Sequence, residues 1–217
     1  MELLDRIDGL IAERHLLTHP FYTRWRDGTL PLEAIQEYTR QYYAFESTFP
    51  RLLSAIHSRT TDPAARQQIL DNLWDEEHGS ANHAELWLRF AEGMGVARED
   101  VRRATPNEGT QRLTDSYWAA ALQASPAAAI AALYAYEGQV PAIAAEKVSG
   151  LRQRYGVDDE RTLAFFEVHS TLDIEHSGAE RDMIRRMADT PEAEGEVLDA
   201  TRRALDSWWG FLDAVNV

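Results

Sequence analysis

His169-Ser-Thr-Leu-Asp173-Ile-Glu-His176 lies inside a long segment without proline, residues 159–187. Such a segment predicts a long helix. At about 100° per residue, His169, Asp173 and His176 fall within roughly 60° of one another on one helix face. Two imidazoles and one carboxylate on successive turns can converge on one cation, as inward-facing side chains do in helical di-metal proteins. The alternative interpretation is an ordinary polar helix face that binds no metal.

The rest of the chain is also helical in pattern, because apolar residues recur with a period near 3.6 and few stretches alternate as strands do. Proline, glycine and capping residues divide it into runs. The expected helices are residues 3–17, 31–57 with a kink at Pro50, 62–92, 110–123, 125–154, 159–187 and 190–212. No internal repeat or linker separates them. The sequence therefore predicts an all-α bundle of about seven helices, forming a single domain over residues 1–217.

The composition excludes several kinds of protein. The 217 residues include no cysteine, which removes disulfides, zinc–thiolate sites, iron–sulfur clusters and a cysteine nucleophile. A metal site must then use His, Asp and Glu, which favours iron, manganese or zinc. The net charge of −14 argues against nucleic acid as a partner. No apolar run approaches the ~20 residues of a membrane span and the first residues are not basic, so we expect a cytoplasmic protein with no membrane partner.

Nearly all of the basic residues are arginines. Of the 22 Lys and Arg residues, only Lys147 is a lysine. A GC-rich coding sequence would explain the excess of arginine. Alternatively, the protein needs at this position an amine that can lose its proton, which arginine cannot provide.

A second group of metal-type residues lies in the segment 62–92. Glu76 and His83 are seven residues apart, so about 20° separates them around the axis of a continuous helix. His78 would lie about 160° from His83, and we therefore select His83. Acidic runs of this kind are more often solvated helix faces, so the pair is weak evidence alone.

Glu137 is the only acidic residue between Asp115 and Glu146, in an apolar and aromatic run. Burying an unpaired carboxylate costs several kcal/mol, so this side chain needs a proton, a cation or a metal unless it lies at a helix edge. Together the candidates are three carboxylates and three imidazoles, which suit two divalent ions. Four positive charges against three negative leave about one net positive charge for an anionic ligand. The candidate ligands are Glu76, His83, Glu137, His169, Asp173 and His176.

These residues resemble the ligand pattern of the heme-oxygenase-like di-metal oxidases: Glu-x6-His, an isolated Glu, then His-x3-Asp-x2-His. All three parts occur in order. That family has a seven-helix bundle fold. Within it, the chain is most similar to the CADD-like para-aminobenzoate synthases. The similarity covers nearly the whole chain and includes His19-Pro-Phe-Tyr22, Leu53-Ser-Ala-Ile-His-Ser-Arg59, Ala132-Leu-Tyr-Ala-Tyr-Glu137, Glu146-Lys147 and Gly210-Phe-Leu-Asp213.

The resemblance implies an O₂-activating di-metal oxidase that makes para-aminobenzoate for folate synthesis from its own side chains. Tyr22 would supply the ring and Lys147 the amino group. Tyr43 and Tyr136 would be further candidates for supporting or radical-relay roles. The implied cofactors are two divalent ions, Fe/Fe or Mn/Fe, with O₂ and an external reductant as co-substrates. The resemblance also implies a homodimer, with an electron donor that the sequence does not identify.

Two other functions remain open. A di-iron oxidase of the same fold could act on an external substrate, for example in fatty-acid decarboxylation or N-oxygenation, and would need neither Tyr22 nor Lys147. A non-catalytic helical binding module would bind no metal. The thiol-dependent chemistry of the related thiaminases is excluded because the chain has no cysteine.

Overall fold

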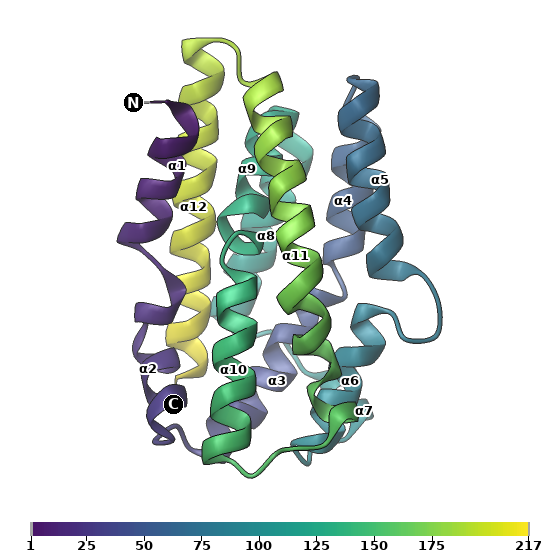
Figure 1. Cartoon of the computed structure of the whole chain (residues 1–217), viewed down its shortest axis with the longest axis vertical. Helices are drawn as coiled ribbons and strands as arrows, with labels where there is room; N and C mark the ends of the chain where they lie inside the picture. Colours follow the sequence, from purple (N-terminus) through teal and green to yellow (C-terminus); the bar gives the residue numbers. More distant parts are fainter. Residues whose placement is uncertain (1, 217) are drawn as a thin grey trace.

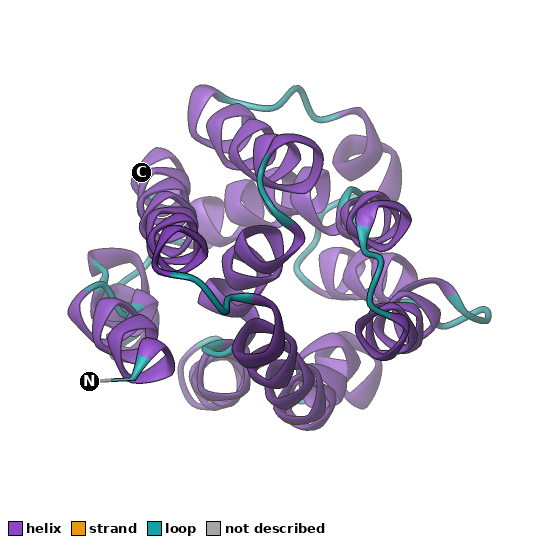
Figure 2. Cartoon of the chain, turned by 90° about the horizontal axis from the view of Figure 1, so that it is seen from above, coloured by secondary structure: helices purple, strands orange, loops and turns teal. Residues whose placement is uncertain are grey.

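The structure, a computed structural model, describes residues 2–216, which form one bundle of packed helices (Figures 1 and 2). No residue between 2 and 216 lies in a strand, which confirms the all-α fold class. The elements in chain order are α1 (Leu3–Glu13), the 3₁₀ turn η1 (Leu16–Thr18), α2 (Pro20–Asp27), α3 (Leu32–Glu46), α4 (Phe49–Arg59), α5 (Pro63–Glu77), α6 (His83–Gly93), α7 (Arg98–Arg103), α8 (Glu108–Gln123), α9 (Pro126–Glu137), α10 (Val140–Arg154), α11 (Glu160–Met187) and α12 (Pro191–Val215).

Helix α11 is the predicted long helix, and it runs along the near side of the bundle in Figure 1. The Asp159 side chain caps it by accepting a hydrogen bond from the Thr162 amide at 2.9 Å. Arg185 and Arg186 lie in its last turn, where positive charge complements the helix dipole. Because α11 packs against α6, α9 and α10, its inward face can meet side chains from all three.

Three predicted helices are divided in the structure, and two further helices, α2 and α7, form where none was predicted. The seven predicted helices therefore become twelve α-helices within residues 2–216. The run 31–57 is not one kinked helix: it breaks at residues 47–48, and Pro50 lies in the first turn of α4, where its missing N–H has no consequence. The run 125–154 breaks after Glu137, since Pro141 has no N–H to donate to the Glu137 carbonyl.

The run 62–92 also breaks, at residues 78–82 between α5 and α6. Gly79 has φ +83°, a left-handed conformation that glycine adopts without strain. Asn82 then caps α6 by accepting a hydrogen bond from the Glu85 amide at 3.0 Å. The prediction of a continuous helix from 62 to 92 was therefore wrong, and this affects how Glu76 and His83 meet.

A close contact between α2 and α10 positions two predicted site residues. Trp25 of α2 is fully buried, and its indole N–H donates to the Lys147 carbonyl at 3.3 Å. A Cβ atom added to Gly150 of α10 would lie 2.5 Å from Trp25 Cδ1, so only glycine permits this approach. The contact holds α2, which carries Tyr22, against the helix that carries Lys147.

No helix formed by residues 2–216 is both long and apolar enough to cross a membrane.

We expect Gly150→Ala to destabilise the protein by about 1–3 kcal/mol, because the added methyl group pushes the Trp25 ring away from α10. Gly9→Ala is the matched control: nothing lies near its Cβ position, and alanine is the better helix former by about 1 kcal/mol. Urea unfolding of both variants measures the difference. A Gly150→Ala protein as stable as the Gly9→Ala protein would contradict the close packing.

Candidate metal centre

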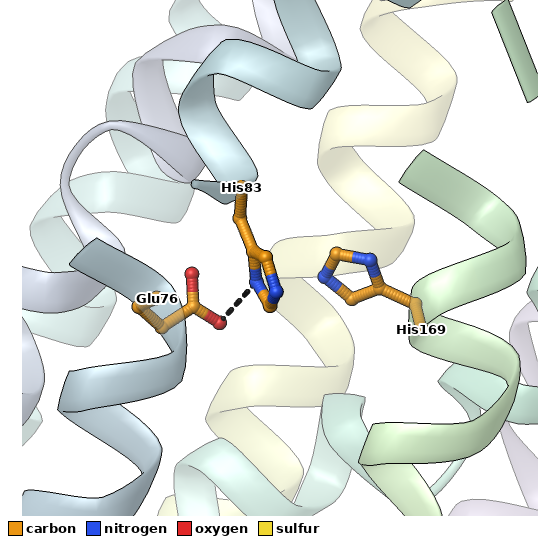
Figure 3. A group of neighbouring side chains, drawn as sticks. All are labelled: Glu76, His83 and His169. Atoms are coloured by element: carbon orange, nitrogen blue, oxygen red, sulfur yellow. Dashed lines mark ion pairs between the residues drawn. The ribbon is translucent and has the colours of Figure 1, made fainter. Parts of the chain in front are cut away.

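Glu76, His83 and His169 form the first triad, in which one ligand-type atom of each residue lies within 4.8 Å of the others. Figure 3 shows Glu76 near the end of α5, His83 at the start of α6, and His169 reaching towards them from α11. His83 Nδ1 lies 2.9 Å from Glu76 Oε1, and the two imidazole centroids are 4.3 Å apart. Two consecutive helices and one distant in the sequence thus converge on one point.

The break between α5 and α6 is what joins Glu76 to His83, not a shared helix stripe. The structure agrees with the choice of His83 rather than His78. It does not agree with the reason for that choice, which was a continuous helix carrying both Glu76 and His83. His78 is exposed and stacks on Trp74, with centroids 4.1 Å apart. His83 is buried because the capped start of α6 turns it inward.

The hydrogen bonding of His169 leaves one nitrogen free for a metal. Its Nδ1 lies 2.7 Å from the Phe165 carbonyl, which can only accept a hydrogen bond. This contact fixes the proton on Nδ1 and leaves the Nε2 lone pair for a metal ion. Burial and the nearby His83 also keep the pKa of His169 well below its ordinary value, so the ring is neutral.

Glu137, Asp173 and His176 form the second triad, again within 4.8 Å. Glu137 is the last residue of α9, and the other two lie on α11. His176 Nδ1 is 3.8 Å from both Glu137 Oε1 and Asp173 Oδ1, while its Nε2 is 3.1 Å from Asp75 Oδ2. Asp75 therefore orients the ring, in the manner of the carboxylates that support metal-binding histidines. Asn72 donates to Glu137 Oε1 at 3.1 Å and fixes that carboxylate.

The two triads share one small cavity of about 20 Å³. Glu76 and His169 of the first triad line it together with Glu137 and Asp173 of the second. All six predicted ligands are 3–8% exposed, so water does not screen them. A cavity of this size holds about one small molecule between the two candidate ion positions.

Unsatisfied polar atoms test whether the site suits metal ions. Within residues 2–216, every buried side-chain nitrogen or oxygen without a hydrogen-bond partner belongs to a residue in or beside the two triads. Buried polar groups are normally paired, since an orphaned one costs about 1–3 kcal/mol. The atoms belong to Glu46, Asn72, His83, Glu137, Asp173, His176 and Glu180. This donor set of imidazole nitrogens and carboxylate oxygens suits two divalent ions such as iron or manganese.

When no metal is bound, protons on the imidazoles balance part of the negative charge of the buried carboxylates. Burial lowers the pKa of His83, but contact with Glu76 outweighs burial and raises it to about 9. The pKa of His176 is also raised to about 9, by Asp173 and other carboxylates against the effect of burial. Both imidazoles are therefore positively charged near neutral pH in the metal-free protein, and a metal ion can replace that charge.

Tyr22 and Lys147 meet in a separate buried site beside the triads. Lys147 Nζ lies 5.6 Å from the ring centroid of Tyr22 and donates to the Tyr38 hydroxyl at 2.5 Å. Tyr42 and Phe166 complete its surroundings, with centroids 5.6 and 5.1 Å from Nζ. We call this group of five residues the lysine site.

Tyr136 is among the residues that line the shared cavity, and Tyr43 is not. The structure brings Tyr42 there instead: its hydroxyl is 3.0 Å from that of Tyr136, and its ring lines the cavity. Tyr43 is half-buried, one residue and about 100° further around α3. Tyr42, and Tyr38 one turn before it, are therefore better placed than Tyr43 for the supporting or radical-relay roles.

Sequence analysis also missed two buried acids, Glu46 and Glu180. Glu46 lines the shared cavity, and burial, together with the charge of Glu76, raises its pKa to about 8. Burial and the adjacent Glu137 raise the pKa of Glu180 well above its ordinary value. For each acid, a feature of the sequence indicates a position near the site. Glu46 ends an aromatic run, and Glu180 continues the spacing of His169, Asp173 and His176 by one more turn.

Comparison with known proteins shows which family the chain resembles. The model of a family described as iron-containing redox enzymes matches residues 36–209. A 4-aminobenzoate synthase from Nitrosomonas europaea is 42% identical, over 98% of this chain and 90% of the relative. A 4-aminobenzoate synthase from Chlamydia muridarum is 38% identical, over 99% of this chain and 90% of the relative.

The fold has a similar counterpart among solved structures. A CADD-like protein of unknown function from Nostoc punctiforme superposes with a TM-score of 0.82 at 18% identity, over 99% of this chain and 95% of that one. At this identity the likeness concerns the fold alone. A domain from Shewanella denitrificans described as having a heme oxygenase-like fold superposes with a TM-score of 0.76 at 18% identity, over 98% of this chain and 88% of that one, and this confirms the predicted heme-oxygenase-like bundle.

We expect wild-type protein to bind two divalent ions and Glu76→Gln to weaken one of them by at least about tenfold, because a neutral amide replaces a ligand carboxylate. Glu77→Gln is the control, since Glu77 is the exposed neighbour. Elemental analysis after dialysis against limiting Mn²⁺ measures the content. Equal metal content in both variants would exclude Glu76 as a ligand.

Metal affinity should increase with pH. Below about pH 9 each ion must displace a proton from His83 or His176, so binding strengthens by up to about tenfold per pH unit for each displaced proton. Calorimetric titration with Mn²⁺ between about pH 6.5 and 8.5, in two buffers of different ionisation enthalpy, counts the released protons. An affinity independent of pH, with no proton release, would contradict this charge balance.

Proposed function

The chain belongs to the iron-containing redox enzymes and, within them, to the 4-aminobenzoate synthases; from this premise we propose that it makes 4-aminobenzoate from its own Tyr22 and Lys147. In the proposed reaction O₂ is the oxidant and an external reductant supplies electrons. The two triads would hold two divalent ions, Fe/Fe or Mn/Fe, and those ions would supply the redox chemistry that O₂ requires.

The observation that carries this proposal is the position of the only lysine in the chain. Lys147 is 2% exposed, and its amine lies beside the ring of Tyr22, which is equally buried. Burying a lysine without a carboxylate partner is costly, so a protein rich in arginine has little structural reason to keep one here. An amine required as a reactant gives it a reason.

The surroundings of Lys147 support its role as a nucleophile. Burial lowers its pKa to about 7, although the charge of Glu46 acts in the opposite direction. About half of the amines are then neutral at pH 7, whereas an ordinary lysine is almost wholly protonated. Only the neutral amine has the lone pair needed to attack an oxidised ring.

A continuous series of phenols connects the lysine site with the shared cavity. Tyr22 and Tyr38 both lie against the Lys147 amine, and the ring of Tyr38 lies 5.6 Å from that of Tyr42. Tyr42 in turn is hydrogen-bonded to Tyr136, and both line the cavity. Burial raises the pKa of each of these phenols, so they remain protonated and can pass a proton or hydrogen atom along the series. Oxidation at the cavity can thereby reach Tyr22 without a direct contact.

The size of the cavity favours the protein's own residues over an external substrate. Pockets that bind drug-sized ligands have volumes of about 300–1,000 Å³, and the cavity between the triads has about 20 Å³. A fatty acid does not fit there. By contrast, the ring and Cβ of Tyr22 supply all the carbon atoms of 4-aminobenzoate. This requires that the Cα–Cβ bond breaks, that O₂ oxidises Cβ to the carboxylate, and that the Lys147 nitrogen replaces the phenolic oxygen, which leaves as water. The Cε–Nζ bond of Lys147 then breaks, and Cε is left oxidised as an aldehyde.

Mass spectrometry after one round of reaction tests the proposal. We expect protein loaded anaerobically with Fe²⁺, or with Mn²⁺ and Fe²⁺, and then given O₂ and a reductant to release at most one 4-aminobenzoate per chain. The peptides that contain Tyr22 and Lys147 should change in mass. Lys147→Met keeps a buried chain of similar length without the amine and should bind metal but release no product.

Two further variants sharpen this test. Lys147→Arg keeps a positive charge but no transferable amine, and it too should release no product. Tyr22→Phe should also release none, whereas Tyr43→Phe should react like wild type, since Tyr43 lies outside both sites. Oxygen uptake with unchanged protein mass would point instead to an external substrate, and undiminished product from Lys147→Met would exclude Lys147 as the amine donor.

A further inference from the structure

Glu180 extends the metal-binding face of α11 by one turn. One stripe along the helix carries four such residues at intervals of four, three and four: His169, Asp173, His176 and Glu180. Glu180 is 2% exposed, so the stripe remains inside the bundle at this point. A glutamate there cannot be explained as part of a solvated face.

Both carboxylate oxygens of Glu180 lack a hydrogen-bond partner among the residues that the structure describes. A buried charge left without partners is strongly destabilising, by several kcal/mol. Glu46, the other buried acid, has only one such oxygen. Glu180 is therefore the acid whose position most needs an additional cation.

Glu180 lies beside the second triad. Glu137 Oε2, like both oxygens of Glu180, is buried without a hydrogen-bond partner, and a cation between such carboxylates would satisfy them. Glu180 and His176 also line one small cavity with Asn72, which orients Glu137. The open space and the unpaired oxygens thus lie on the same side of the second triad.

We propose that Glu180 is a fourth protein ligand of the ion held by Glu137, Asp173 and His176. The inference rests on the metal centre under the proposed function and adds a residue outside the Glu-x6-His, Glu, His-x3-Asp-x2-His pattern. The ligand set at this position becomes three carboxylates and one imidazole. The first triad keeps one carboxylate and two imidazoles.

This assignment makes the two metal positions unequal and changes the charge of the centre. A divalent ion in the first triad carries about one net positive charge, and one in the extended second triad about one net negative charge. The centre is then close to neutral, whereas six ligands alone would leave it positive. The extended second triad offers mostly hard oxygen ligands, while the first offers mostly nitrogen.

Calorimetric titration with Mn²⁺ alone tests this assignment. Wild-type protein should bind two ions, and Glu180→Gln should lose at least about tenfold in affinity at one position while the other is unchanged. Glu180→Asp keeps the charge but is too short to reach the same ion, so it should behave like Glu180→Gln. Glu175→Gln, an exposed change on the same helix, is the control and should bind like wild type.

Thermal unfolding gives a second readout. Without metal, Glu180→Gln should melt at a higher temperature than wild type, because the buried acid opposite Glu137 is gone. With excess Mn²⁺ the melting temperature of Glu180→Gln should rise by less than that of wild type, because the variant binds one ion more weakly. If Glu180 had only a structural role, Mn²⁺ would raise the melting temperatures of the two proteins by the same amount.

Three results would overturn the inference. They are unchanged affinity at both positions in Glu180→Gln, full rescue by Glu180→Asp, or a crystal structure with Mn²⁺ in which no Glu180 oxygen lies within about 2.0–2.3 Å of the ion. Failure of the proposed function looks different: wild-type protein would then bind no metal, or would bind two ions and release no 4-aminobenzoate.

Discussion

The burial of a dense group of charges between α5, α6, α9 and α11 is the constraint on which the rest of the structure depends. Three carboxylates and three imidazoles lie within two adjoining triads, and water reaches almost none of them. Such a group is unstable unless positive charge is added, because desolvation opposes every ionised form. Protons on His83 and His176 supply that charge without metal. The same geometry makes the centre a strong competitor for divalent ions, since an ion provides more charge than the proton it displaces.

Interruptions in the helices create the centre, and they mark the limit of what the sequence predicts. Periodicity identified α11 and its ligands, because a long regular helix follows directly from local pattern. It also identified Glu137, since one acid in an apolar run signals an unusual environment. It did not identify the loop at residues 78–82, which joins Glu76 to His83, because one glycine inside a helical pattern is compatible with continuation. The two side chains do meet, but through the loop and not along one continuous helix.

The tyrosines show a second limit. Tyr42 and Tyr43 are neighbours in an aromatic helix whose inner face is wide, so residue type alone does not show which ring points towards Tyr136. Packing decides this: Tyr42 lies between Trp87 and the shared cavity, with its ring 4.2 Å from that of Trp87. In the same way, the burial of Glu46 and Glu180 depends on which helices cover α3 and α11. Such tertiary information is absent from any single stretch of sequence, although the spacing of Glu180 hinted at it.

The full burial of Tyr22 has a consequence for the lifetime of each molecule. Its ring packs edge-to-face on Phe21, with centroids 5.3 Å apart, in a core with little free space. Removing a ring of this size from a packed core typically costs about 3–5 kcal/mol, against a total stability of about 5–15 kcal/mol for a folded domain. A molecule that has given up Tyr22 in the proposed reaction would therefore unfold more often than one that has not. Cellular proteases that degrade unfolded chains would remove spent molecules first and leave fresh ones in place.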